Sequence, residues 1–167
     1  MNYNFPVIHW CKKSTRVQFK PFTEMPNEES VTSCMVFVKK DNSVLLTRPE
    51  RGWGLPGGHR ESDESPEDCA RREVREEADV EPKNLTLVGG WKAQKIIHIE
   101  ENDRYPEIAY QLLFLADVEQ INKFVPNHES LERKFVNYNE IKKYHHEFDR
   151  FSIILTYILD RIKIEHW

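Results

Sequence analysis

Apolar residues gather along the chain in short runs that predict β-strands. Residues 32–38 form an apolar run with β-branched and aromatic members, which predicts a buried strand. The turn sequence Asp41-Asn42-Ser43 follows, and residues 43–47 complete a predicted hairpin. Further extended segments are predicted at residues 85–88, 95–99 and 108–118, with a short strand at residues 134–136.

Two segments carry the signals of helices. The first is predicted to begin after Ser65, a good N-cap, because Pro66 suits the first helical position and Asp68 stands at capping-box spacing. It is expected to run to about Ala78. The second places apolar residues at helical spacing near the C-terminal end, at Phe151, Leu155, Ile158 and Ile162. Strands, a helix, more strands and a helix predict an α/β fold with a mixed sheet between helices.

The first 30 residues differ in character from the rest of the chain. They mix aromatic residues with Pro6, Pro21 and Pro26, and residues 16–19 are expected to form an edge strand. The length of 167 residues fits one domain of ordinary size. We therefore predict one domain at residues 31–167 and an N-terminal extension at residues 1–30 that packs on it.

Composition places the chain among soluble globular proteins. Hydrophobic residues make up 39% and charged residues 31% of the sequence, and the mean hydropathy is −0.69. No apolar run is long enough to span a bilayer, and the first residues lack the pattern of a signal peptide. A cytoplasmic location without membrane contact is expected. Cys11, Cys34 and Cys69 lie far apart without zinc-ligand spacing, and free thiols are predicted.

The net charge of −4 is unevenly distributed. Residues 58–80 contain nine acidic residues and four arginines, a net charge of −5, which leaves +1 for the rest of the chain. This segment would repel the phosphates of a duplex unless cations intervened. The charge pattern therefore disfavours binding to duplex nucleic acid.

Three of these acids fall on one face of the first predicted helix. At about 100° per residue, Glu73, Glu76 and Glu77 lie within an arc of roughly 100°. Glu73 and Glu77 repel each other at i, i+4, and hard divalent cations, which prefer carboxylate oxygens, would neutralise the cluster. A solvated surface face is the alternative interpretation of the helix taken alone.

A loop rich in glycine and proline precedes this helix, at residues 49–58. Gly57 and Gly58 follow Pro56, and glycines let the backbone approach a ligand closely, so their N–H groups could cradle phosphate oxygens. A plain turn is the alternative. The position of the loop directly before the acidic segment favours the phosphate interpretation.

Read together, these residues resemble the Nudix box. Gly58 is followed by five residues and a glutamate, then by seven residues and Arg-Glu-apolar-any-Glu-Glu. The matching positions are Gly58, Glu64, Arg72, Glu73, Val74, Glu76, Glu77 and Val80. The departure is Asp79, where the family usually has glycine. Aspartate tolerates the left-handed conformation expected after a helix end better than most residues do.

The resemblance implies the α/β/α Nudix fold and an enzyme that hydrolyses a pyrophosphate bond in a nucleoside diphosphate linked to another group. It implies Mg²⁺ as cofactor, with Mn²⁺ as a possible substitute, held by Glu73, Glu76 and Glu77, and by a backbone carbonyl of Gly57 or Gly58. Glu76, Glu77 and Arg72 would be catalytic, with Arg72 orienting a glutamate through a charge-assisted hydrogen bond. A small nucleotide-type substrate and a possible homodimer also follow from the resemblance.

Other roles stay open at this point. Glu64 is expected to support the helix start or hold a metal-bound water. The general base is a glutamate of the box or a later one, Glu129 or Glu132, although both also fit solvated loop acids. Arg48 and Arg51 would meet substrate phosphates or add solubility, and Trp53 would stack on a base or join the core.

Two other classes of protein compete with the enzyme. A catalytically silent Nudix-like module would bind a nucleotide and regulate a partner, and a structural protein would merely carry an acidic surface helix. The presence of all the box glutamates favours the enzyme. Substrate selectivity is expected in loops outside the box, and residues 100–106 are predicted to form one of them.

Overall fold

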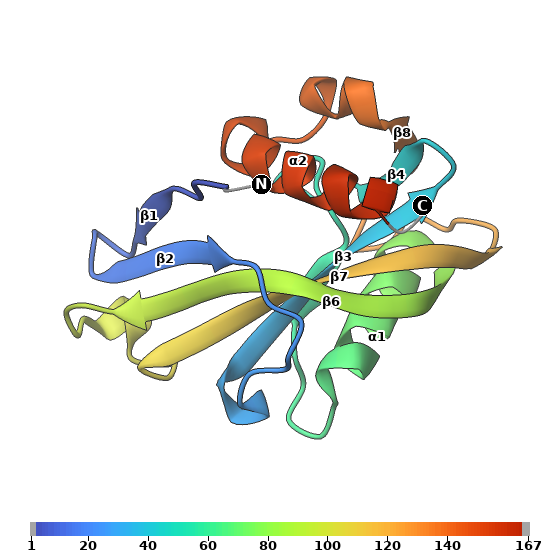
Figure 1. Cartoon of the computed structure of the whole chain (residues 1–167). Helices are drawn as coiled ribbons and strands as arrows, with labels where there is room; N and C mark the ends of the chain where they lie inside the picture. The colour runs from blue at the N-terminus through green and yellow to red at the C-terminus, as the bar shows by residue number, and fades with distance from the viewer. Residues whose placement is uncertain (1–2, 165–167) are drawn as a thin grey trace.

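A mixed sheet runs through the centre of the molecule, with one long helix on each face (Figure 1). The structure, a computed structural model, describes residues 3–164. Helix α1 (Pro66–Ala78) packs on one face and helix α2 (Phe148–Ile164) on the other. The predicted α/β fold with a mixed sheet between helices is confirmed. No helix in the described part of the chain has both the length and the apolar character to cross a bilayer.

Within residues 3–164 the sheet has eight strands in the order β1-β2-β6-β7-β3-β4-β8, with β5 paired to β3. Strands β3 and β7 run parallel, and the other pairs are antiparallel. The strands are β1 (Val7–Trp10), β2 (Thr15–Lys20), β3 (Val31–Lys40), β4 (Ser43–Thr47), β5 (Gly57–His59), β6 (Val80–Lys95), β7 (Ile108–Ile121) and β8 (Arg133–Asn137). The short 3₁₀ helices are η1 (Glu28–Ser30), η2 (Glu100–Asn102) and η3 (Tyr138–Lys143).

Alternation along the strands builds a separate core on each face of the sheet. In β3, Val36 and Val38 point toward α1, while Phe37 between them points toward α2. All three side chains are fully buried. A run with no exposed alternate position is typical of a central strand covered on both faces, which is why the apolar pattern at residues 32–38 predicted it correctly.

The structure corrects the predictions for two segments, one expected as a loop and one as a strand. The loop predicted at residues 49–58 ends early, because Gly57 and Gly58 pair with β3 and open strand β5. The strand predicted at residues 95–99 is wrong beyond Lys95. The amides of Ile96 and Ile97 donate to the carbonyl of Ser14, at 2.7 and 3.1 Å, so the chain leaves the sheet there.

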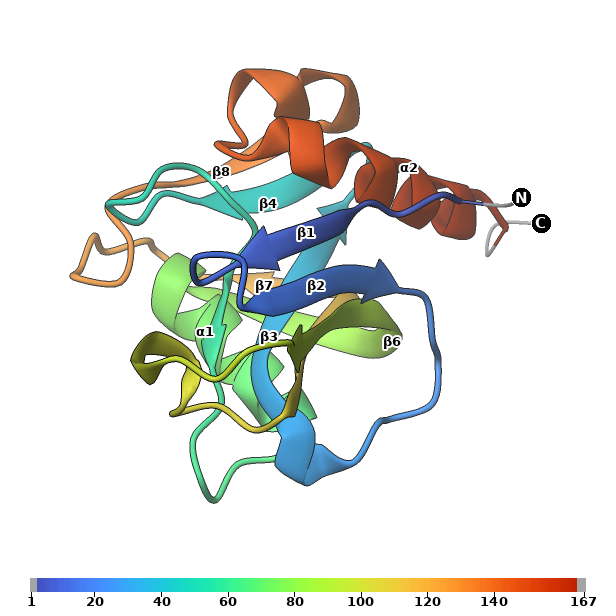
Figure 2. The same cartoon turned by 90° about the vertical axis from the view of Figure 1, so that its left-hand side faces the viewer.

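The N-terminal residues extend the sheet. Residues 16–19 lie within β2, as predicted, but β2 is not an edge strand because β1 pairs along its outer side (Figure 2). Phe5 and Phe19 are buried against Tyr157 of α2, with ring centroids 5.8 Å apart in both pairs. The division into an extension at 1–30 and a domain at 31–167 stays a prediction.

Helix α1 ends where the sequence departs from the box pattern. Asp79 adopts the left-handed conformation with φ 51° and ψ 39°, as expected after a helix end. Its Oδ2 accepts a hydrogen bond of 2.9 Å from the amide of Val125. The guanidinium of Arg133 donates to the carbonyls of Ala78 and Asp79, the latter at 3.1 Å. The aspartate therefore also links the helix end to the segment after β7.

Candidate active site

Three glutamates of α1 lie at the rim of the α1-side core, beside β5. Glu73 and Glu77 are only 7% and 3% exposed, whereas the side chain of Glu76 is 47% exposed. The stripe of small apolar residues next to them is fully buried and holds the helix close to the sheet; it consists of Ala70, Val74 and Ala78. This packing holds the carboxylates of Glu73 and Glu77 just below the protein surface.

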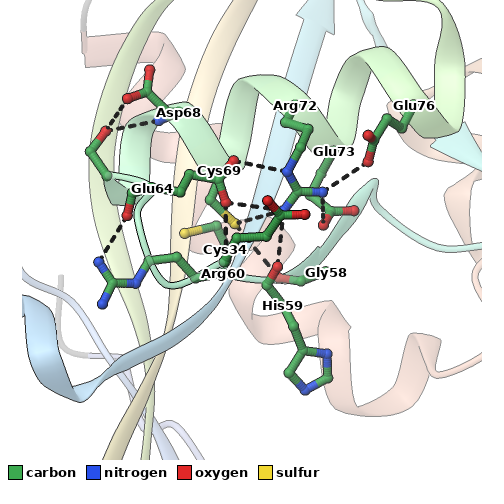
Figure 3. Close-up of polar contacts among 12 residues, drawn as sticks. Cys34, Gly58, His59, Arg60, Glu64, Asp68, Cys69, Arg72, Glu73 and Glu76 are labelled. Carbon is green, nitrogen blue, oxygen red and sulfur yellow. Dashed lines mark hydrogen bonds and ion pairs between the residues drawn. The ribbon is translucent and has the colours of Figure 1, made fainter.

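Arg72 connects the acids of this segment (Figure 3). Its Nη1 donates to Glu73 and to Glu76, each at 2.8 Å. Its Nε and Nη2 donate to the two carboxylate oxygens of Glu64, at 2.8 and 3.1 Å, and Nη2 also donates to the carbonyl of His59. These bonds raise the pKa of Arg72, and the bond from Arg72 is the main cause of the lowered pKa of Glu64. Glu64 thus holds the arginine in place.

The two glycines of β5 fit closely between β3 and α1. A Cβ added to Gly57 would lie 2.3 Å from the carbonyl oxygen of Cys34, and one added to Gly58 would lie 2.5 Å from Oε1 of Glu73. Because the clash at position 57 is with backbone, glycine is required there, whereas a side chain at position 58 would force the Glu73 carboxylate to move. The backbone of β5 therefore runs directly alongside the buried carboxylates.

Glu77 is the most deeply buried acid of the cluster. Thr47 of β4 donates to its Oε2 at 2.7 Å, and Nη2 of Arg51 lies 3.9 Å from its Oε1. Burial raises the pKa of Glu77 to about 7, against the opposing effects of Thr47 and Arg51. Burial also raises the pKa of Glu73. Two carboxylates are thus held where a negative charge is poorly solvated.

The donor set fits a hard divalent cation. Carboxylate oxygens are the ligands that Mg²⁺ prefers, and a bound cation would offset the burial of Glu73 and Glu77. Among residues 3–164, no three His, Cys, Asp or Glu side chains already stand in the arrangement of a metal site. Glu76 and Glu73 each direct an oxygen to Arg72 instead. Only one oxygen of each carboxylate takes part in these two bonds, so the other oxygen of each could meet a cation.

The two later glutamates lie differently. Glu132, a candidate general base, forms an ion pair with Arg48, a candidate ligand of the substrate phosphates. Each of these two side chains is therefore already paired with the other. Glu129 pairs with His128 at 2.9 Å, and its charge contributes to the raised pKa of Glu73. Of these two acids, Glu129 is therefore the one whose charge acts on the cluster.

The remaining predicted substrate residues also separate. Arg51 has a side chain 59% exposed and lines the cavity described below, next to Glu77. Trp53 packs against the core on the α2 side and meets Tyr144 edge-on, with ring centroids 5.9 Å apart. The structure therefore brings Arg51 to the site and gives Trp53 a packing contact.

A cavity of about 560 Å³ opens beside β5 on the α2 face of the sheet. Gly57, Gly58 and Arg51 form one end of it. Side chains from β6 and β7 form its floor, and the loop between these strands supplies part of its wall; these residues include Trp91, Ala93, Lys95, Arg104, Tyr105, Pro106, Ala109 and Gln111. The predicted selectivity loop at residues 100–106 thus lines the cavity. Its volume matches that of typical small-molecule sites.

The model of the NUDIX domain matches residues 28–155 of this chain. The chain belongs to the Nudix family. The match covers strands β3 to β8, helix α1 and part of α2, and so includes the acid cluster and most of the cavity lining. The resemblance that the box residues carried is thereby confirmed.

Relatives of known sequence match the central part of the chain. A protein of Mycobacterium tuberculosis whose name proposes an 8-oxo-dGTP diphosphatase is 33% identical over 90 residues, which are 53% of this chain and 39% of that protein. The Bacillus subtilis protein YtkD, whose name proposes the same activity, is 30% identical over 106 residues. These residues are 61% of this chain and 60% of YtkD. The chain thus spans less than two thirds of the length of either relative.

A solved structure resembles nearly the whole chain. The Bacillus subtilis pyrophosphohydrolase BsRppH, in a mutant form, superposes with a TM-score of 0.70 at 24% identity. The similarity covers 97% of this chain and 98% of that one. It establishes a common fold that includes the N-terminal strands as well as the part matched by the Nudix model.

The sequence did not reveal every residue around this Nudix site. Thr47 and His59 contact the acids or their arginine, and Asn127 donates to the carbonyl of Glu76 at 3.0 Å. Thr47 stood as a polar residue at the end of an apolar run, which is a signal that could have found it. His59 contacts Arg72 through its own backbone carbonyl, and the side chain of Asn127 bonds to a backbone carbonyl of α1, so neither contact follows from the pattern of side chains.

Proposed function

We propose that this chain hydrolyses a pyrophosphate bond in a nucleotide-type substrate and that it depends on Mg²⁺. The observation that carries the proposal is the position of Glu73 and Glu77, which are buried beside β5, the strand whose two glycines line the cavity. The cavity accommodates a small molecule, and its lining includes Arg51, which lies 3.9 Å from Glu77 and could meet an anionic group. The relatives' names, which propose 8-oxo-dGTP diphosphatases, support a nucleotide.

Glu73, Glu76 and Glu77 would hold the cation, with Mn²⁺ as a substitute for Mg²⁺. When bound, the cation withdraws charge from the phosphates and lowers the pKa of a coordinated water. Gly57 or Gly58 would add a carbonyl oxygen. The substrate's negative charge explains why the acid cluster needs a cation before a phosphate chain approaches it.

The chain's own residues supply orientation and proton transfer. Arg72 holds the carboxylates of Glu73 and Glu76 through short bonds and is itself held by Glu64. Arg51 would contact a phosphate oxygen from the cavity side. We propose a glutamate of the cluster, Glu76 or Glu77, as general base, with Glu129 as the alternative from outside the helix.

The test is turnover by the purified chain with Mg²⁺ against nucleoside triphosphates, nucleotide sugars, dinucleoside polyphosphates and coenzymes, with products identified by mass. We expect one class to be hydrolysed and Glu77→Gln to lower kcat by about a hundredfold or more, because loss of a metal ligand removes several kcal/mol of charge stabilisation. Glu140→Gln is the matched control, since Glu140 lies in η3 with a side chain 48% exposed and pairs with the nearby Lys143.

Unchanged turnover in Glu77→Gln would contradict the assignment of the site. Tight nucleotide binding without turnover of any class would instead support the catalytically silent module. The two results are distinct because the first is measured on an active protein and the second on an inactive one.

A further inference from the structure

One wall of the cavity comes from the β1–β2 hairpin. Trp10, at the end of β1, is 43% exposed and lines the cavity together with Cys11 and Thr15. The hairpin precedes residue 28, where the match to the Nudix model begins. The lining of the cavity is therefore shared between the family domain and a segment that its model does not include.

Strand register places Trp10 on the same face of the sheet as the cavity residues of β6 and β7. Trp10 pairs with Thr15 on β2, and Thr15 pairs with Lys95 on β6. Ala93, two residues before Lys95 and so on the same face, pairs with Ala109 on β7. The small side chains of the two alanines leave room above the sheet, and the Trp10 indole stands at the border of that space. A flat apolar surface bounded by an exposed aromatic ring suits a planar ring.

The hairpin is tied by Asn102 to the loop between β6 and β7, which also lines the cavity. This side chain is 2% exposed, and its Nδ2 lies 3.0 Å from Oγ of Ser14, 3.3 Å from Oγ1 of Thr15 and 2.9 Å from the carbonyl of Ile97. Its Oδ1 accepts from the amide of Ile99 at 3.1 Å. A buried amide with this many partners fixes the hairpin and the loop relative to each other.

The turn of the hairpin is held in an uncommon backbone conformation. Cys11, Lys12 and Lys13 are all left-handed, with φ of 47°, 55° and 70°. Non-glycine residues persist in this region only where their surroundings hold them. Lys12 pairs with Glu101 of the β6–β7 loop, and Ser14 donates to the carbonyl of Cys11 at 2.6 Å. In Figure 1 the turn lies at the same end of the sheet as the loop that follows β6.

From this geometry we infer that Trp10 is a specificity-determining residue that stacks on the base of the nucleotide, and that Asn102 is the residue that positions it. The inference rests on the proposed function. The glycines of β5, Arg51 and Trp10 all line the same cavity, so one ligand that fills it could place its phosphates near β5 and its base against the indole. The aromatic side chains Trp91 and Tyr105 also line this cavity.

The experiment measures binding rather than turnover. The affinities of the full chain for the α,β-methylene triphosphates of adenosine and guanosine, which resist hydrolysis, and for inorganic tripolyphosphate are measured by calorimetry with Mg²⁺. We expect Trp10→Ala to weaken binding of at least one nucleotide roughly tenfold, the effect of losing one base-stacking ring. Tripolyphosphate, which has no base, keeps its affinity. Trp10→Phe retains most of the nucleotide affinity because a ring remains.

Val7→Ala is the matched control, since Val7 is an exposed residue of the same strand, 39% exposed. Asn102→Ala is expected to weaken nucleotide binding like Trp10→Ala, and the double variant to show little further loss, because both act on one contact. If the losses of nucleotide affinity in the double variant were additive, the positioning role of Asn102 would be refuted. If Trp10→Ala lost as much affinity for tripolyphosphate as for the nucleotides, the substitution would have damaged the cavity in general and the stacking role would be refuted.

The outcome is separable from that of the proposed function. Normal turnover together with unchanged nucleotide affinity in Trp10→Ala overturns the inference and leaves the hydrolase intact. Absence of turnover with a tenfold, base-dependent loss in Trp10→Ala overturns the hydrolase and keeps the binding role of Trp10.

Discussion

Arg72 organises the charged residues of the site at the scale of single side chains. It donates hydrogen bonds to Glu64, Glu73 and Glu76, and its planar fork reaches all three because its nitrogens point in different directions. A lysine has one compact charged group and cannot reproduce this arrangement. The guanidinium therefore contributes geometry as well as charge, which is the part of its role that a substitution can isolate.

Replacing Arg72 by lysine is expected to lower kcat roughly tenfold to a hundredfold, because charge-assisted hydrogen bonds worth about 1.5–3 kcal/mol each are lost from the carboxylates. Steady-state kinetics with Mg²⁺ measures the effect. Arg75→Lys serves as the control, since Arg75 is on the same helix, is half exposed and pairs with Glu81 away from the cluster. Equal activity of Arg72→Lys and Arg75→Lys would show that the fork has no catalytic importance.

At the scale of elements, the end of α1 determines how the helix joins β6 and the segment after β7. The left-handed conformation of Asp79 costs about 1–2 kcal/mol for a residue with a side chain. Its hydrogen bond with Val125 and the bonds from Arg133 to the last carbonyls of the helix act against this cost. An aspartate thus replaces the usual glycine without disturbing the glutamates.

Substitutions at Asp79 separate these two effects. Asp79→Gly removes the backbone strain and loses a hydrogen bond worth about 1 kcal/mol, so the free energy of unfolding is expected to change by less than about 1 kcal/mol. Asp79→Ala loses the bond and keeps the strain, and a loss of about 1–2 kcal/mol is expected. Urea unfolding measures both, with Asp79→Asn as the control that keeps an acceptor and tolerates the left-handed region. A more stable Asp79→Ala would refute this account.

At the scale of the whole molecule, the segment before α2 connects the cavity wall to the α2-side core. His145 is 8% exposed and stacks between the rings of His146 and Phe151, with centroids 5.5 and 4.5 Å away. His146 binds the carbonyl of Trp53, through its amide at 3.0 Å and its Nδ1 at 2.7 Å. This contact holds the loop before β5 against the segment that precedes α2.

Burial, and then the neighbouring His146, lower the pKa of His145 to about 4. The unfolded chain takes up a proton near pH 6.5 and the folded chain only near pH 4, so this residue reduces stability as the pH falls through that window. His145→Gln is expected to reduce this pH dependence by about 1–2 kcal/mol between pH 6.5 and pH 5, measured by urea unfolding. Burial of Glu77 acts with the opposite sign, and the comparison between variant and parent removes its effect.

His128→Gln is the control for this prediction, because His128 has a side chain 89% exposed. Its substitution is expected to leave the pH dependence of unfolding as in the parent. An identical pH dependence in His145→Gln and the parent would show that His145 is protonated in the folded state.

Local sequence signals predicted those elements whose cause is local. Ser65 accepts from the amide of Asp68 at 3.1 Å, and α1 spans Pro66–Ala78 as the cap, the proline and the helix end indicated. The strands expected around residues 43–47 and 134–136 also formed. The segment at 95–99 failed as a strand because Ser14, distant in sequence, takes its hydrogen bonds. Non-local partners leave no trace in the pattern of the segment itself.

The sequence by itself determined the identity and helical spacing of the box residues, and hence the family, because a rigid helix fixes which side chains share a face. Only the tertiary structure decided which carboxylates are buried, that Arg72 binds several of them, and that Glu132 pairs with Arg48 while the charge of Glu129 acts on Glu73. It also decided that Trp10 borders the cavity. These facts depend on strand pairing and loop placement, whose energies come from contacts between distant parts of the chain.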